Sequence, residues 1–179
     1  MKKLLVVLTV FALLSCNEQN KREHEALQAK QVNFEAKETE EKKVRAYAEA
    51  YVNAMNSPNW KTEMRKYLKE GPDADKFLNE EYTLFRKSFP NATTVIKHMA
   101  VEGNECILWL EETANYAAMY TGSDKEFRDH ILGGIKADNQ KLTWNEVWYF
   151  DVVDGKFGGK WDFLKDNYAV LKGLGVLGK

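Results

Sequence analysis

Apolar residues recur at helical spacing in a segment that begins near residue 44. One face of the predicted helix carries Val44, Tyr47, Ala48, Tyr51 and Met55. This is the i, i+3, i+4, i+7 pattern of an amphipathic helix. Weaker patterns of the same period predict helices over 60–68 and 74–88, and a proline-containing turn precedes each of them.

From residue 93 onward the spacing of apolar positions changes to two, which is typical of strands. The predicted strands cover 93–101, 105–120, 142–153 and 156–164, with a short closing helix over 166–177. Gly103-Asn104 and Asp154-Gly155 have the composition of hairpin turns. Helices followed by a meander of strands predict an α+β fold, with the helices packed on one face of an antiparallel sheet. The length of 44–179 suits a single domain.

The first residues have a different pattern, with Lys2 and Lys3 preceding an apolar run over 4–14. The run is too short to cross a hydrocarbon core, so the pattern predicts a secretory signal peptide over 1–15. Leu13-Leu14-Ser15-Cys16 resembles a bacterial lipobox. The resemblance implies that Cys16 is lipidated and becomes the first residue of a protein anchored to a membrane of the cell envelope, on its periplasmic or extracellular face. The alternative is an ordinary signal peptide with a chance cysteine.

Residues 16–43 are polar and show no sustained apolar stripe. Such a segment buries too little surface to offset the entropy of the ordered chain. We therefore expect a tether, partly helical at most, that holds the folded domain away from the membrane.

Charge and cysteine content exclude several classes of function. The full chain has 26 Lys and Arg against 27 Asp and Glu, and two of those lysines lie in residues 1–15. The remaining chain is mildly acidic, which argues against nucleic-acid binding. The histidines lack metal-ligand spacing, so we expect no metal and no cofactor. Cys106 lies within an apolar strand pattern and is expected to be a small buried hydrophobe.

The order and spacing of the elements over 44–177 resemble the SnoaL-like, or polyketide cyclase-like, branch of the NTF2-like superfamily. The matching motifs are Phe89-Pro90-Asn91, Gly103-Asn104, Asp154-Gly155-Lys156, Trp161 and Leu174-Gly175. The resemblance implies an NTF2-like (cystatin-like) cone, in which a strongly bent antiparallel sheet wraps around the helices and encloses a pocket. It also implies that the sheet is a candidate surface for a homodimer.

Strand alternation supplies the candidate pocket residues. One face of the strand over 143–153 carries Trp144, Glu146, Trp148, Phe150 and Val152. In a dry pocket, desolvation would raise the pKa of Glu146 and allow general acid or base chemistry. The alternatives are that Glu146 faces water or is satisfied by a cation or backbone donor. Trp109 and Trp161 are further candidates for the lining, although aromatic stripes on strands are often plain core.

The resemblance also implies a catalytic aspartate a few residues beyond Trp161. Asp162 and Asp166 are the nearest candidates, while Lys165 stands at the equivalent position. We therefore favour a lipid-anchored, non-catalytic module that binds a small apolar ligand or a partner. The alternative is an isomerase, cyclase or dehydratase that uses a pocket carboxylate as its base. An isolated carboxylate deep in the cone would favour chemistry, and one paired to a cation would favour binding alone.

Overall fold

The computed structural model describes the backbone of residues 2–133 and 135–176, and side chains from residue 20 onward outside that gap. The side chain of Cys16 lies outside the described residues. The chain divides into two compact units, Met1–Glu40 and Glu41–Lys179. Within the described part of the chain, no helix has the length and apolar character needed to cross a membrane.

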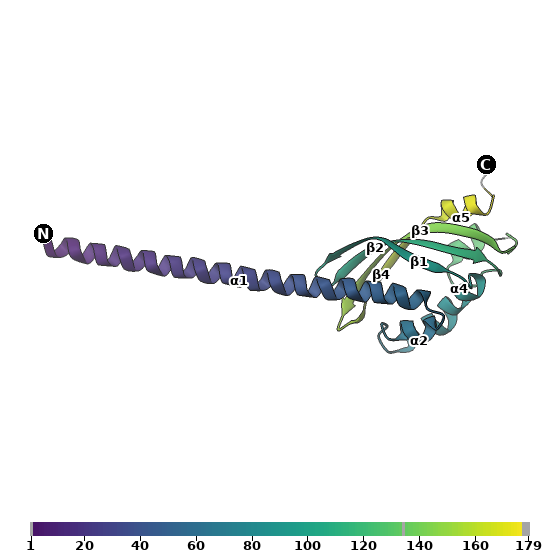
Figure 1. The fold of residues 1–179 in the computed structure, drawn as a ribbon, viewed down its shortest axis with the longest axis horizontal. Coiled ribbons are helices and arrows are strands. Elements are labelled where there is room, and N and C mark those ends of the chain that lie inside the picture. The colour runs from purple at the N-terminus through teal and green to yellow at the C-terminus, as the bar shows by residue number, and fades with distance from the viewer. Residues whose placement is uncertain (1, 134, 177–179) are drawn as a thin grey trace. The chain divides into compact units, whose positions relative to one another are not determined.

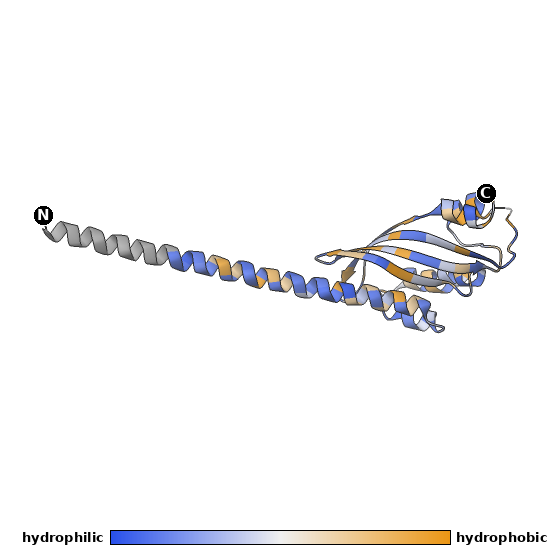
Figure 2. Ribbon diagram, turned by 45° about the horizontal axis from the view of Figure 1, so that its top comes forward, coloured by the Kyte–Doolittle hydropathy of each residue, from blue (hydrophilic) through white to orange (hydrophobic). Residues whose placement is uncertain are grey.

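Helix α1 covers Lys2–Asn56, so the prediction that 16–43 is partly helical at most is wrong. Residues 20–40 are all exposed, and Figure 2 shows mostly hydrophilic colours along this part of the helix. The segment is rich in Glu, Lys, Ala and Gln, which have high helix propensity. Gln31 also donates to Glu35 one turn later, at 3.0 Å. Local propensity therefore makes this segment helical even though it buries no apolar face.

The second unit is an α+β fold, as predicted (Figure 1). After α1 come the helical elements α2 (Trp60–Arg65), α3 (Pro72–Lys76), η1 (Phe77–Glu81) and α4 (Tyr82–Ser88). The strands and remaining helical elements are β1 (Thr93–Glu102), β2 (Glu105–Tyr116), η2 (Glu126–Ile131), β3 (Gln140–Val153), β4 (Lys156–Lys165) and α5 (Asn167–Gly173).

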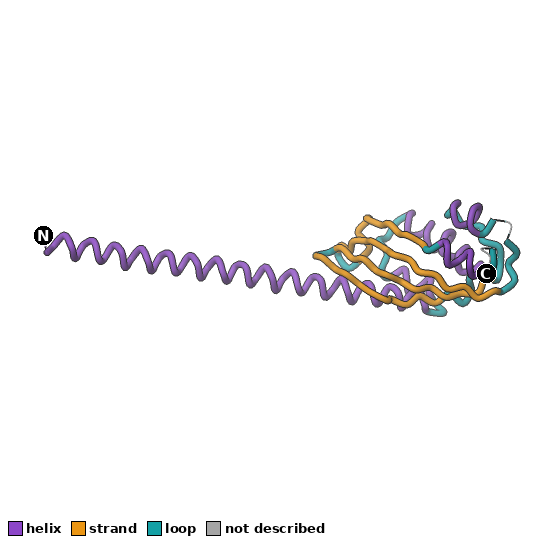
Figure 3. The backbone as a smooth tube through the Cα atoms, turned by 90° about the horizontal axis from the view of Figure 1, so that it is seen from above, coloured by secondary structure: helices purple, strands orange, loops and turns teal. Residues whose placement is uncertain are grey.

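The strands form one antiparallel sheet in the order β1-β2-β3-β4. Gly103 and Gly155 adopt positive φ angles of 59° and 68° in the turns that join β1 to β2 and β3 to β4. The ladder is irregular between Ile96 and His98 and between Phe150 and Val152. Such irregularities bend a strand, and Figure 3 shows the curved course of the strands.

Strand alternation separates a buried inner face of the sheet from an exposed outer face. The inner face of β2 and β3 packs against α1, with Leu108, Leu110 and Phe150 fully buried. A second apolar cluster surrounds Trp144 and includes Val170 of α5. The outer face exposes Val95, Ile107, Trp109, Val147 and Leu164.

Two details differ from the sequence predictions or extend them. The strand predicted over 105–120 ends at Tyr116, and η2 forms in a polar stretch for which no helix or strand was predicted. Asp124 accepts a hydrogen bond from the Phe127 amide at 3.0 Å, and Phe127 is buried.

Cys106 is buried as predicted, and burial raises the pKa of its thiol to about 11.

Candidate functional site

A cavity of about 440 Å³ lies between the inner face of the sheet and the helices. Most of its wall is apolar or aromatic, from Tyr51, Met55, Met64, Phe77, Tyr82, Phe85, Tyr120, Trp148, Trp161 and Phe163. Its polar groups are Glu81, Glu112, Ser123, Asp124, Glu146 and Lys165. A few polar groups in an aromatic cavity are typical of small-molecule sites.

Glu146 lies on the inner face of β3, as alternation predicts, and is only 6% exposed. Its Oε1 accepts a hydrogen bond from the indole of Trp144 at 2.9 Å, and its Oε2 accepts one from the indole of Trp148 at 2.7 Å. Lys165 is opposite Glu146 on β4, with its Nζ 3.5 Å from Oε1. Glu146 is therefore a paired carboxylate, which corresponds to the alternative in which a cation satisfies it.

The ammonium of Lys165 is held by three groups. Besides Glu146, its Nζ lies 3.8 Å from Asp124 Oδ2 and 3.9 Å from the centre of the Phe127 ring. The lysine side chain is 11% exposed. It therefore connects β4 to the segment around η2, and its charge is already engaged by residues of the protein.

Glu112 is the second buried carboxyl group of the cavity, and sequence reasoning missed it. It lies on the inner face of β2, where it is 3% exposed. Its Oε1 accepts a hydrogen bond from the Thr94 hydroxyl at 3.3 Å, whereas its Oε2 is buried without a hydrogen-bond partner among the described residues. This is an unusual arrangement, because buried polar atoms are nearly always hydrogen-bonded.

Burial raises the pKa of Glu112 well above its ordinary range, and the nearby charge of Glu146 raises it further. Lys165, the Thr94 hydroxyl and Arg86 act in the opposite direction. Burial also raises the pKa of Tyr82, and the charge of Glu112 adds to that rise. Glu112 is therefore the carboxyl group of this cavity whose protonated form burial favours.

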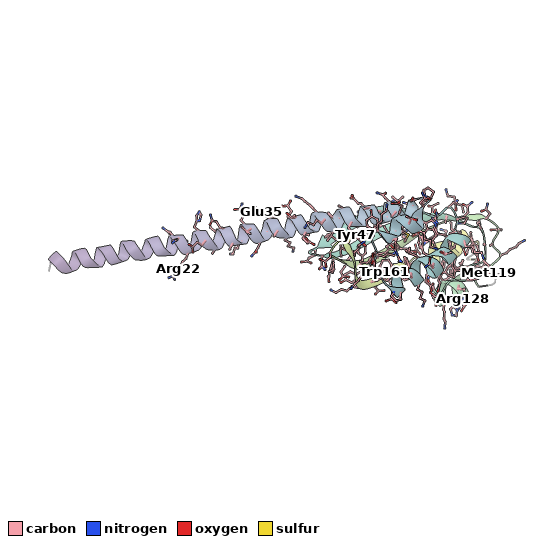
Figure 4. All side chains as sticks on the ribbon, turned by 90° about the horizontal axis from the view of Figure 1, so that it is seen from below. Arg22, Glu35, Tyr47, Met119, Arg128 and Trp161 are labelled. Carbon is pink, nitrogen blue, oxygen red and sulfur yellow. The ribbon has the colours of Figure 1, made fainter. Side chains whose placement is uncertain are left out.

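The structure places the tryptophans predicted to line the pocket in different environments. Trp148 and Trp161 line the cavity, and Figure 4 labels Trp161. Trp144 is fully buried and is not part of the cavity wall, although its indole orients Glu146. Trp109 is 44% exposed on the outer face, where its indole donates to Asn145 at 3.0 Å. The prediction that Trp109 lines the pocket is therefore wrong. Trp109 and Glu112 are three positions apart in β2, so their side chains lie on opposite faces of the sheet.

The two aspartates suggested by the family resemblance are outside the cavity wall. Asp162 lies opposite Tyr149 on the outer face and accepts a hydrogen bond from the Phe163 amide at 2.8 Å. Asp166 caps α5, where its carboxylate accepts from the Ala169 amide at 3.0 Å. Neither is placed to act on a molecule in the cavity. Lys165, which departs from the family pattern, is the residue of this segment that reaches the site.

A second cavity, of about 580 Å³, adjoins the first. Tyr51, Phe77 and Trp161 line both cavities. The rest of the second wall comes largely from the segment 68–74 and from residues 157–160 at the start of β4. Among the residues that the structure describes, no group of three or more His, Cys, Asp or Glu side chains is arranged to hold a metal ion.

Comparison with solved structures identifies the fold. AclR from Streptomyces galilaeus is 18% identical, with a TM-score of 0.58 over 76% of this chain and 98% of that chain. A SnoaL-like polyketide cyclase from Agrobacterium tumefaciens is 10% identical, with a TM-score of 0.55 over 74% and 98%. An LEH-like epoxide hydrolase from M. tuberculosis is 15% identical, with a TM-score of 0.50 over 75% and 91%.

No family model and no curated protein matches the sequence. The structural matches nevertheless show that this chain has the fold of the SnoaL-like polyketide cyclases, as the motifs over 44–177 predicted. At these identities the likeness establishes the fold, and the chemistry has to be argued from the residues of the cavity.

Proposed function

We propose that the second unit is a small-molecule binding domain, in which the bent sheet and the helices form a cone around a partly apolar ligand. The observation that carries this proposal is the 440 Å³ aromatic cavity with the unpartnered Oε2 of Glu112 in its wall. A ligand that gives this atom a hydrogen bond would remove the cost of leaving it unpaired. Native mass spectrometry of the purified protein tests the proposal by detecting a small molecule that co-purifies with it.

A second candidate function is a small-molecule isomerase, cyclase or dehydratase. Glu112 supports this candidate, because a buried, protonated carboxyl group can act as a general acid near neutral pH. The SnoaL-like cyclase and epoxide hydrolase folds among the structural neighbours are consistent with it. In this candidate Glu112 takes the role first assigned to Glu146, Asp162 or Asp166. Conversion of a co-purified molecule by the parent, but not by a folded Glu112→Gln variant, would distinguish catalysis from binding.

Two tryptophans of nearly equal exposure allow a matched test of the cavity. Trp161 in the cavity wall is 43% exposed, and Trp109 on the outer face is 44% exposed. We expect Trp161→Ala to weaken binding of the neutral fluorescent probe N-phenyl-1-naphthylamine by about tenfold, because truncating an aromatic side chain that packs against a bound molecule costs more than about 1 kcal/mol. Trp109→Ala should leave the affinity unchanged. Fluorescence titration measures both.

The control separates loss of the site from loss of the fold, since both variants remove one partly exposed indole from the same sheet. Circular dichroism should show that both remain folded. Equal affinity in Trp161→Ala and the parent, or an equal loss in Trp109→Ala, would place the probe elsewhere and contradict the proposed cavity.

We further propose that Cys16 carries the lipid and anchors the protein to a membrane of the bacterial cell envelope. The support is the sequence Leu13-Leu14-Ser15-Cys16 after an apolar run. The exposed polar segment 20–40 would then lie between the anchor and the folded unit along the chain.

Replacement of Cys16 with Ser is expected to abolish incorporation of labelled fatty acid and to leave the leader uncleaved or release the protein from membranes. Stable anchoring needs more than one acyl chain, which lipoprotein modification supplies. Membrane fractionation and labelling of the parent and variant test this expectation. Normal labelling and processing of Cys16→Ser would exclude Cys16 as the attachment site.

A further inference from the structure

Most of the ionisable side chains that line the 440 Å³ cavity are acidic. Resting on the proposed binding function, we infer that the cavity takes an organic cation, in which a protonated amine is attached to an apolar, preferably aromatic, group. The geometry behind this inference is a surplus of carboxyl groups inside an aromatic wall, one of which has a buried and unpartnered oxygen.

Four carboxyl groups and one ammonium group line the cavity. They belong to Glu81, Glu112, Asp124, Glu146 and Lys165. Most of the acids have partners within the protein: Glu81 accepts from the Ser123 amide at 3.1 Å, Asp124 from the Phe127 amide at 3.0 Å, and Glu146 from two indoles. Glu112 is the exception, because its Oε2 has no hydrogen-bond partner among the described residues. Among these carboxyl groups, the buried oxygen that remains for a ligand is therefore Oε2 of Glu112.

Lys165 is poorly placed to attract an anion. Its ammonium is shared between Glu146 at 3.5 Å and Asp124 at 3.8 Å, and it lies over the ring of Phe127. An anionic ligand would have to displace one of these partners and would face the remaining carboxylates. A cation meets no repulsion from the carboxylates, and the one ammonium group of the lining, Lys165, is already paired with Glu146 and Asp124. Desolvated like charges therefore disfavour the anion more strongly.

The aromatic wall favours a cation as well. Trp148 and Trp161 lie with their ring centres 4.8 Å apart, and Tyr82 and Phe85 with theirs 5.6 Å apart, all in the lining of the cavity. The faces of such rings attract an ammonium group, most strongly where water is excluded. A carboxyl group together with aromatic faces therefore matches both parts of an aryl-alkylamine.

Binding of a cation should release a proton from Glu112. The groups that act on its carboxyl are Glu146 and Lys165 from the sheet, Thr94 from β1 and Arg86 from α4, while Tyr82 of α4 responds to its charge. An ammonium ion placed at Oε2 would stabilise the ionised form, so Glu112 becomes a carboxylate and its proton passes to solvent. The ligand keeps its own proton and no covalent bond is made or broken.

The test compares 1-naphthylmethylamine, which stays protonated between about pH 5.5 and pH 8, with the neutral and nearly isosteric 1-naphthalenemethanol. We expect the amine to bind about tenfold more tightly than the alcohol at about pH 8, since a charge-assisted hydrogen bond adds more than about 1.4 kcal/mol. Its affinity should increase with pH, whereas that of the alcohol should not. Isothermal titration calorimetry in buffers of different ionisation enthalpy measures the released proton directly.

Glu112→Gln serves as the matched variant. It should abolish proton release and remove the preference for the amine over the alcohol. Equal or tighter binding of the alcohol by the parent, binding of the amine without proton release, or no binding of the amine would each overturn the inference. The N-phenyl-1-naphthylamine titration reports separately on the cavity, so a failure of the cation inference is distinguishable from a failure of the proposed binding function.

Discussion

Replacing Glu112 with Gln is expected to make the protein increasingly more stable than the parent as the pH rises above about 4.3, the pKa of an unfolded glutamate. Burial, and then the charge of Glu146, raise the folded-state pKa of Glu112. The unfolded chain therefore loses this proton first, and the parent loses stability between the unfolded and the folded pKa. Gln cannot ionise, so the variant avoids that loss.

The size of the effect follows from linkage, in which each unit of upward shift is worth about 1.4 kcal/mol. We expect the difference in unfolding free energy between variant and parent to grow by at least about 1.4 kcal/mol between about pH 4 and pH 8. The absolute difference at the acidic end is less informative, because the introduced amide group would also lack a partner at the position of Oε2. Urea unfolding of both proteins over this pH range measures the trend.

Glu111→Gln is the matched control for this prediction. Glu111 is the neighbour of Glu112 in β2, but it lies on the outer face, with its side chain 38% exposed and 3.5 Å from Lys97. Its replacement should not reproduce a stability gain that increases with pH. A difference between Glu112→Gln and the parent that stays constant over the same pH range would show that Glu112 ionises normally in the folded protein.

The main elements of the fold could be predicted because local sequence signals and tertiary packing agree there. The apolar spacing that begins at Val44 matches the helix face that the structure buries, and the glycines of both hairpins stand where positive φ is required. The helix over 20–40 was missed because the prediction relied on an apolar stripe, whereas this helix rests on local propensity and on side-chain contacts between successive turns. The segment that contains η2 was missed because its buried residue Phe127 is surrounded by charged residues.

The candidate site was predicted only in part, because its chemistry depends on residues that are far apart in the sequence. Alternation placed Glu146 on the inner face correctly. The same alternation along 106–116 includes Glu112 between buried residues, and that signal could have identified it. Strand alternation does not show which carboxyl group has a cation nearby. Lys165 lies opposite Glu146 through the β3–β4 pairing, whereas Glu112 has a single hydroxyl partner.

Replacing Glu146 with Gln should have the opposite effect to replacing Glu112 with Gln. We expect it to destabilise the protein by about 3 kcal/mol at neutral pH, or roughly 10 °C in melting temperature. Glu146 accepts hydrogen bonds from two indoles and neutralises Lys165. An amide has one oxygen for these donors, and its NH2 group would face the second indole. The ammonium of Lys165 would remain buried, with Asp124 at 3.8 Å as its remaining carboxylate neighbour within 4 Å among the described residues.

The pair of Glu105 and Lys160 supplies the control. It also joins a glutamate and a lysine from two strands of the sheet, but at an exposed position. Glu105→Gln should change the melting temperature little, since exposed ion pairs contribute little to stability. The double variant Glu146→Gln/Lys165→Met should recover part of the loss, because it removes the uncompensated charge. Thermal and urea unfolding of the four proteins measures these differences. A Glu146→Gln variant as stable as the parent would mean that Glu146 does not pair with Lys165. The assignment of Glu112 as the available acid of the cavity would then fail as well, because it rests on Glu146 being the paired one.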